Sequence, residues 1–328
     1  MTNTRAKILL PVLENASLIL FVGVFSVFAM KSAKFLTIEN LINILIQSSS
    51  VGIVAIGMTF VLLTAGIDLS VGAIMFLSAA IAGKLILGGC SVGLAFVAIV
   101  AIGFLYGALN ACFITRLRIL PFIVTLATLF AGRGLSLLIT QTRAMNLPEL
   151  VQIGSARIVG IPFPVLVFAA VLIAAHVTLT RTAFGRHVYA VGNDAEAAKK
   201  AGINLGRVLF SVYVISGLCA AVGGLVLLSQ LGAVSPTFGD KREFAAIAAA
   251  VLGGTSLFGG KGKVFPGTVL GAVLIQMVEN GLNTVSADPY IYPLVISPII
   301  FLAVFTDSVR HTQLQKLKRR KIRVEVFE

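Results

Sequence analysis

The sequence predicts an all-α, polytopic integral membrane protein with about ten transmembrane helices and with both termini in the cytoplasm. Of its 328 residues, 58% are hydrophobic and only 12% are charged, whereas soluble domains have roughly 25% charged residues. The chain therefore lacks the polar side chains that a water-facing surface needs. Its apolar residues form continuous runs separated by short basic loops, rather than the alternating pattern of an outer-membrane barrel.

Ten apolar runs are candidate spans. Lipid offers no hydrogen-bond partner to the backbone, so a span must be a helix of roughly 17–25 residues. The run at 244–258 is short for a full crossing, and we expect a short helix shielded by its neighbours or a segment that enters and leaves on one side. The first run follows Arg5 and Lys7 like a signal peptide, but further spans follow at once, which favours an uncleaved helix. The ten runs are 9–29, 41–64, 69–87, 92–114, 119–139, 162–179, 208–228, 244–258, 264–282 and 290–305.

The distribution of the 26 Lys and Arg residues predicts the orientation. With the N-terminus inside, 18 of them fall on the cytoplasmic side, seven fall outside, and Arg133 lies within a span. Seven of the 18 belong to a basic cytoplasmic tail at 307–328, which follows a single transmembrane domain at 1–306. The net charge of +13 is then juxtamembrane charge that faces anionic lipid. We expect the lipid bilayer and no nucleic acid as its partner.

No catalytic or metal-binding pattern stands out in the sequence. The three histidines lie in separate segments, and the three cysteines are scattered among apolar residues. The segment 254–261 loosely resembles a phosphate-binding loop, but Gly262 follows Lys261 where that loop needs a Ser or Thr for magnesium. The sequence therefore predicts neither a catalytic residue, nor a metal ligand, nor a cofactor bound by this chain.

Polar side chains inside or near the ends of spans are the candidates for a translocation path. Asp68 is either the N-cap of a helix beginning at Leu69 or a functional carboxylate. Arg133 either faces a pore or pairs across a helix crossing, and Glu279 is either interfacial or a ligand contact. Each polar candidate could equally be an interhelical hydrogen bond. The six path candidates are Gln47, Asp68, Asn110, Arg133, Asn280 and Asn283.

The longest loop expected on the cytoplasmic side is 181–207. Within it, Asn193 or Asp194 is a good N-cap, residues 195–201 favour a helix, and Gly202 is a C-terminal stop. The loop therefore predicts a short exposed helix, which is either a docking element for a soluble partner or an ordinary connector.

This loop also carries a family motif. Glu196-Ala197-Ala198-x-x-x-Gly202 matches the EAA-x-x-x-G pattern of permease subunits in binding-protein-dependent ABC importers. The surrounding residues, an early block at 57–72 and a late block at 248–263 resemble the ribose-type sugar permeases of that class. The three blocks occur in the order expected for the family and extend over most of the chain.

The resemblance implies a function as well as a fold. It implies that 1–306 is a permease domain of a bacterial inner-membrane importer for a monosaccharide or related polyol, and that the chain itself is not an enzyme. Its partners would be a second permease subunit, as in a homodimer, a cytoplasmic ATPase with two nucleotide-binding domains that holds ATP and Mg, and a periplasmic sugar-binding protein. The alternative is a stand-alone secondary transporter or facilitator. The residues implied to contact the ATPase are Ala195, Glu196, Ala197, Ala198, Lys199, Gly202 and Ile203.

Overall fold

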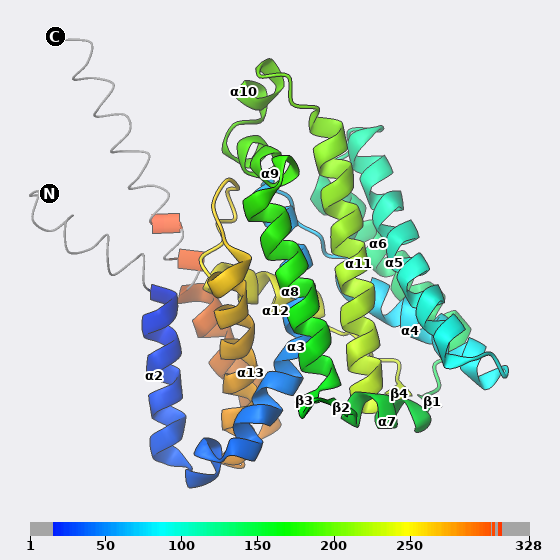
Figure 1. Ribbon diagram of the computed structural model, residues 1–328, viewed down its shortest axis with the longest axis vertical. Coiled ribbons are helices and arrows are strands. Elements are labelled where there is room, and N and C mark those ends of the chain that lie inside the picture. The colour runs from blue at the N-terminus through cyan, green and yellow to red at the C-terminus, as the bar shows by residue number, and fades with distance from the viewer. Residues whose placement is uncertain (1–15, 303, 306–307, 310–328) are drawn as a thin grey trace, which may run out of the picture.

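The computed structural model describes residues 16–302, 304–305 and 308–309 (Figure 1). The expected start of the first span at 9–15 and nearly all of the basic tail at 307–328 lie outside these residues. Helices dominate, and they are α2 (Ala16–Lys31), α3 (Ile38–Leu63), α4 (Val71–Leu87), α5 (Val92–Thr115), α6 (Pro121–Thr140), α7 (Glu149–Ser155), α8 (Phe163–Arg181), α9 (Ala183–Asn193), α10 (Ala195–Lys200), α11 (Leu205–Leu231), α12 (Arg242–Leu252), α13 (Val269–Thr284) and Tyr292–Leu302.

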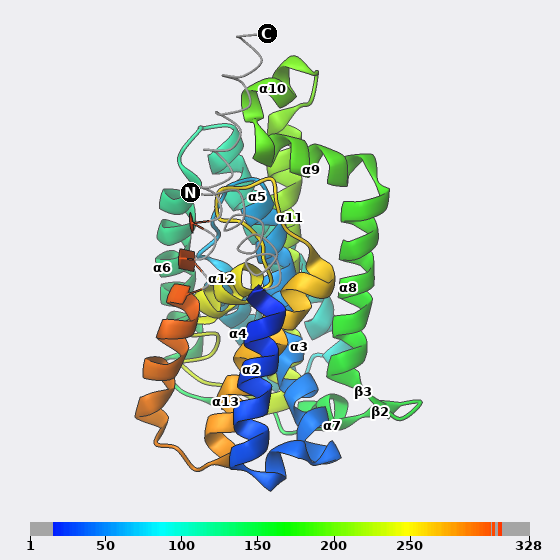
Figure 2. The ribbon, with the colours of Figure 1, turned by 90° about the vertical axis from the view of Figure 1, so that its left-hand side faces the viewer.

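The helices form a bundle with two distinct ends. Helices α9 and α10 project from one end, which we call the α10 end, while α7 and four two-residue strands lie at the other, the α7 end (Figures 1 and 2). Strand β1 (Met145–Asn146) pairs antiparallel with β4 (Ala233–Val234), and β2 (Arg157–Ile158) pairs with β3 (Ile161–Pro162). Three short turns complete the described elements, namely η1 (Ala33–Leu36), η2 (Val264–Thr268) and η3 (Pro289–Ile291).

Five described helices, α3, α5, α6, α8 and α11, are long and apolar enough to cross a membrane. Each begins and ends within three residues of a span predicted from the sequence. Helices α2, α4 and Tyr292–Leu302 are apolar but shorter. The count of about ten spans and the sidedness of the ends stay predictions.

Three predicted spans differ from the structure in their extent or continuity. The run at 244–258 contains α12, which has 11 residues, about 16 Å at 1.5 Å per residue, and is followed by Gly253 as its C-cap. Its residues Ala248–Leu252 are buried, as expected of a shielded short helix. The run at 264–282 is not one regular helix, because Phe265, which precedes a proline, has extended backbone (φ −119°, ψ 133°) within η2, and α13 begins only at Val269. Helix α4 begins at Val71 rather than Leu69.

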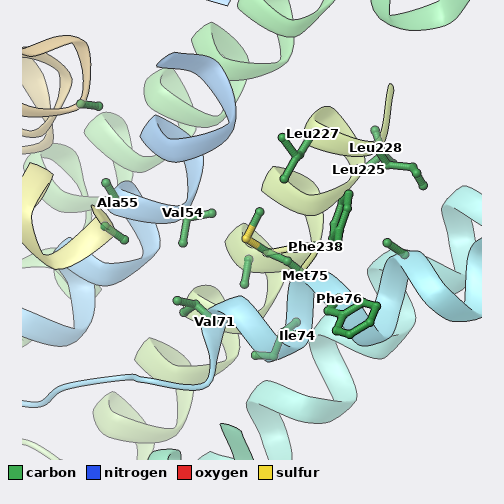
Figure 3. Close-up of a cluster of buried hydrophobic side chains, with 14 of the residues drawn as sticks. Val54, Ala55, Val71, Ile74, Met75, Phe76, Leu225, Leu227, Leu228 and Phe238 are labelled. Atoms are coloured by element: carbon green, nitrogen blue, oxygen red, sulfur yellow. The ribbon is translucent and has the colours of Figure 1, made fainter. Parts of the chain in front are cut away.

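Helices α3 and α11 form the centre of the bundle. Most of their residues are buried, whereas α5, α6 and α8 turn long apolar faces outward, as lipid-facing helices do. Figure 3 shows the core where α4 fits between them: Val54 and Ala55 of α3, Met75 and Phe76 of α4, and Leu225 of α11 gather in one cluster.

Small residues let α5 approach α11 closely. A Cβ at Gly103 or Gly107 would lie 2.6 Å from the backbone oxygen of Gly217 or Tyr213, respectively. Likewise, a Cβ at Gly271 would overlap the carbonyl oxygen of Ala249 in α12. The Gly-x-x-x-Gly pairs at 103/107 and 267/271 therefore stand at points of close backbone approach.

The α5–α11 contact gives a stability prediction. Gly107→Ala is expected to lower the free energy of unfolding by about 1–3 kcal/mol, because its methyl group would force the two backbones apart. Gly134→Ala is the matched control, since a Cβ at Gly134 meets nothing within 4 Å. Thermal unfolding of the purified protein in detergent should show a lower midpoint for Gly107→Ala alone, and equal midpoints would contradict the packing account.

Candidate functional site

Helices α9 and α10 form a capped unit at the α10 end. The Thr182 hydroxyl oxygen accepts the Gly185 N–H (3.1 Å) at the start of α9, where a Cβ at Gly185 would overlap the Leu179 carbonyl oxygen. Asp194 ends α9 and caps α10, because its Oδ1 accepts the Ala197 N–H at 3.0 Å. Of the two predicted N-cap candidates, Asp194 is therefore the one used.

A Schellman motif ends α10. The Ile203 N–H donates to the Ala198 carbonyl oxygen and the Gly202 N–H to that of Lys199, both at 3.0 Å. Gly202 has φ +83°, a conformation that side chains disfavour. The predicted helix that begins after an N-cap and stops at Gly202 is confirmed. Of its residues only Ala198 is buried, while Ala195, Glu196, Ala197, Lys199 and Lys200 are exposed.

The unit is attached to the bundle by backbone contacts that we call the glycine junction, formed by Leu63, Ala65, Gly192, Gly259 and Gly260. The Gly260 N–H donates to the Leu63 carbonyl oxygen at 2.9 Å. A Cβ at Gly192 would overlap that same oxygen and lie 2.5 Å from the Gly260 nitrogen. Ala65, Gly259 and Gly260 all have positive φ. Three backbones therefore meet where no side chain fits between them.

Tyr189 adds a second tether to the same loop. Its hydroxyl donates to the Gly262 carbonyl oxygen at 2.9 Å. Burial raises the pKa of the Tyr189 phenol above its ordinary value, so the hydroxyl keeps its proton and remains a donor at physiological pH. The junction thus joins residues from the early block, the loop at 181–207 and the late block. Each block is recognisable in the sequence, but their contact is visible only in the structure.

Between α3 and α4 the chain is non-helical, and Asp68 anchors this link. Asp68 is fully buried; its Oδ1 accepts from the Ser70 N–H (3.0 Å) and hydroxyl (2.6 Å), and its Oδ2 accepts from Ser216 of α11 (2.7 Å). Asn110 of α5 donates to Ser70 Oγ at 2.8 Å. The expectation that Asp68 caps a helix beginning at Leu69 is wrong, because Ser70 is the N-cap residue of α4. Asp68 and Asn110 instead join three helices around the start of α4.

Arg133 of α6 pairs with a carboxylate. Its Nη2 lies 3.1 Å from Asp240 Oδ1, and Asp240 belongs to the turn before α12, so this ion pair joins α6 to a loop. Asp240 is 48% exposed, however, so the pair lies at a surface of the bundle. The neighbouring Glu243 is buried against the first turn of α4, where a Cβ at Gly72 would overlap its Oε2.

The remaining path candidates have different surroundings. Asn280 of α13 exchanges two amide hydrogen bonds with Asn40 of α3, both at 3.0 Å, and is therefore a helix–helix contact. Asn283 is exposed at the end of α13. Gln47 lines a cavity of about 590 Å³ near the α7 end, between α3, α11 and α13. Of the six path candidates, Gln47 alone lines this cavity.

Gln230, Gln276 and Glu279 also line this cavity. The sequence left Glu279 open as a ligand contact but did not single out Gln230 or Gln276. Gln276 and Glu279 lie three residues apart on α13, a spacing that places them on one helix face and that could have been noticed. Within the described residues, no group of three or more His, Cys, Asp or Glu side chains could hold a metal ion.

Comparison with known proteins identifies the family. A family model described as "Branched-chain amino acid transport system / permease component" matches residues 40–305. The chain belongs to this permease family. The ribose import permease RbsC of Haemophilus influenzae is 34% identical over 92% of this chain and 95% of its own length, and that of Bacillus subtilis is 38% identical over 88% and 91%. The D-allose transport system permease AlsC of Escherichia coli is 37% identical over 84% and 85%. No solved structure matches the chain.

The glycine junction generates the second prediction. Gly192→Ala should displace Gly260 from Leu63 and raise the hydrogen exchange rate of the Gly260 amide by about tenfold or more. Gly206→Ala is the control at the same end, because its Cβ meets only Asn204 Oδ1 at an ordinary 3.4 Å. Hydrogen–deuterium exchange of both variants measures the rate at the Gly260 amide. An unchanged rate in Gly192→Ala would show that the glycine junction accommodates a methyl group without losing the hydrogen bond from Gly260 to Leu63.

Proposed function

We propose that the chain is the membrane-spanning subunit of an ATP-driven importer for a monosaccharide or a related polyol. The observation that carries the proposal is α10, a short, doubly capped and exposed helix that is attached to the bundle through the glycine junction. Such a helix is a suitable contact for a soluble partner, because it projects from the bundle and its caps hold it without help from neighbours. Relatives with the names of ribose and allose permeases, aligned over most of the chain, support the substrate class.

In this proposal, α10 is the coupling helix of a cytoplasmic ATPase. Glu196 and Lys199 lie on its exposed surface, while Ala198 and Ile203 pack toward the bundle. When ATP brings the two nucleotide-binding domains together, the displacement of α10 passes through α9 to the glycine junction. The junction contacts both the end of α3 and the link to α4, so the motion reaches Asp68 and the start of α4 in the interior.

The assembly that we propose contains two copies of this chain, one ATPase polypeptide with two nucleotide-binding domains, and a periplasmic binding protein that delivers the sugar. ATP and magnesium belong to the ATPase. The α10 end faces the cytoplasm of a bacterium, the complex lies in the inner membrane, and both termini are cytoplasmic. The family model and the relatives support this assembly at the level of the family.

Exchange of charge on α10 tests the coupling role. Glu196→Arg reverses the charge in the first turn of α10, and Gly202→Val disrupts the Schellman motif because Gly202 has φ +83°. Both variants are expected to reduce ATP-dependent uptake of D-ribose and D-allose by more than about tenfold, since either removes binding or positioning at a shared contact. Uptake is measured in cells that produce the full transporter, with membrane abundance quantified alongside.

Glu149→Arg is the matched control, with the same charge reversal on an exposed residue at the α7 end. It should leave uptake unchanged. Normal uptake in both α10 variants would contradict the coupling assignment. Gradient-driven flux of the same sugars in proteoliposomes that lack any ATPase would instead support a secondary transporter or facilitator.

A further inference from the structure

The cavity near the α7 end has the size and lining of a binding site. Its volume of about 590 Å³ lies within the range of roughly 300–1,000 Å³ that is usual for small-molecule sites. Ile46 and Leu227 form apolar parts of its wall, while Gln47, Gln276 and Glu279 form a polar part. A carboxylate and primary amides are unfavourable neighbours for lipid, so this lining indicates an aqueous ligand rather than acyl chains.

The polar wall is held in place by one amide group. Gln276 Nε2 donates to Gln47 Oε1 at 3.0 Å and to Glu279 Oε2 at 3.1 Å, so both of its protons are used. Gln276 itself is 8% exposed and fixed within α13. This arrangement orients α3 and α13 side chains toward each other and leaves the Gln47 amide group and Glu279 Oε1 without a hydrogen-bond partner among the described residues.

Charge around the cavity is mixed. Arg157 of β2 and Arg242 of α12 also line it, but neither forms an ion pair with Glu279 within the described part of the chain. The wall therefore offers a carboxylate acceptor, an amide donor and guanidinium donors, together with apolar surface. A hydroxyl group both donates and accepts, so several hydroxyls on one small carbon skeleton would satisfy such a wall.

We propose that this cavity binds the transported solute as a neutral polyhydroxylated molecule, with Glu279 accepting from a hydroxyl and Gln47 donating to another. Gln276 is the positioning residue that holds both. The assignment rests on the proposed importer function and adds to it a site within the permease itself, close to the end through which solute enters.

The first test changes the charge of Glu279 and preserves its shape. Glu279→Gln keeps an oxygen that can accept from Gln276, but it removes the charged acceptor that the proposal gives to the ligand. D-Ribose uptake in cells with the full transporter is expected to fall roughly tenfold, as for loss of a charge-assisted hydrogen bond. Glu149→Gln, the same change on an exposed residue outside the cavity, should transport like the wild type.

The second test measures occupancy of the cavity by a ligand and does not require transport. Gln47→Cys is introduced after Cys90, Cys112 and Cys219 are replaced by alanine, and its reaction with a membrane-impermeant methanethiosulfonate is followed in the purified full-length chain. Saturating D-ribose should slow the reaction, and D-ribonate, which adds a negative charge, should protect less. A Gln47→Cys, Glu279→Gln variant should lose the protection by D-ribose.

Each failure points to a different cause. Equal labelling with and without D-ribose, in a chain that otherwise supports ATP-dependent uptake, overturns the cavity assignment and leaves the importer function standing. Stronger protection by D-ribonate than by D-ribose overturns the neutral ligand. Oxidative cross-linking of Gln47→Cys between two copies would assign this face to a subunit interface instead. Absence of ATP-dependent uptake in the wild type contradicts the proposed function itself.

Discussion

The hydrogen bond from the Gly260 N–H to the Leu63 carbonyl oxygen holds together three segments that are far apart in the sequence. Gly192 lies against the same oxygen, so the end of α3, the end of α9 and the loop that follows α12 meet backbone to backbone. The contact exists only because these positions carry no Cβ or accept positive φ. The position of α10 relative to the bundle depends on this contact, since α9 is the short helix that connects α10 to the bundle. The path of the link between α3 and α4 depends on the contact as well, because that link begins next to Leu63.

Polar groups in the interior follow a second constraint. A carboxylate or amide removed from water is costly unless it is hydrogen-bonded. Asp68 therefore has three donors around it, and Asn280 exchanges two hydrogen bonds with Asn40. A rare polar residue in an apolar span is therefore a position where a hydrogen-bond partner is required. Its presence in the sequence does not tell whether that partner is a ligand or another helix. Of the six path candidates only Gln47 lines the cavity.

Helix α3 connects the two regions that we consider functional. Gln47 at the cavity and Leu63 at the glycine junction lie on this one helix, 16 residues or about 24 Å apart along its axis. Most side chains between them are fully buried, and α11, α4 and α12 pack around them. Close packing of this kind resists compression and transmits strain. The geometry therefore provides a continuous mechanical connection between the α10 end and the cavity.

The sequence by itself determined the features that depend on local physics. Continuous apolar runs predicted the five long helices to within three residues, and Asp194 and Gly202 predicted the bounds of α10, because caps and hydropathy act within a few residues of the chain. Only the tertiary structure decided where α4 begins, where α12 ends within the run 244–258, which carboxylate pairs with Arg133, and that Gln47, Gln276 and Glu279 share one wall. Each of these depends on contacts between segments distant in the sequence. Neither composition nor periodicity tells which distant segments come into contact. In the sequence alone each of these polar residues has several possible hydrogen-bond partners, and only the fold brings one particular partner close.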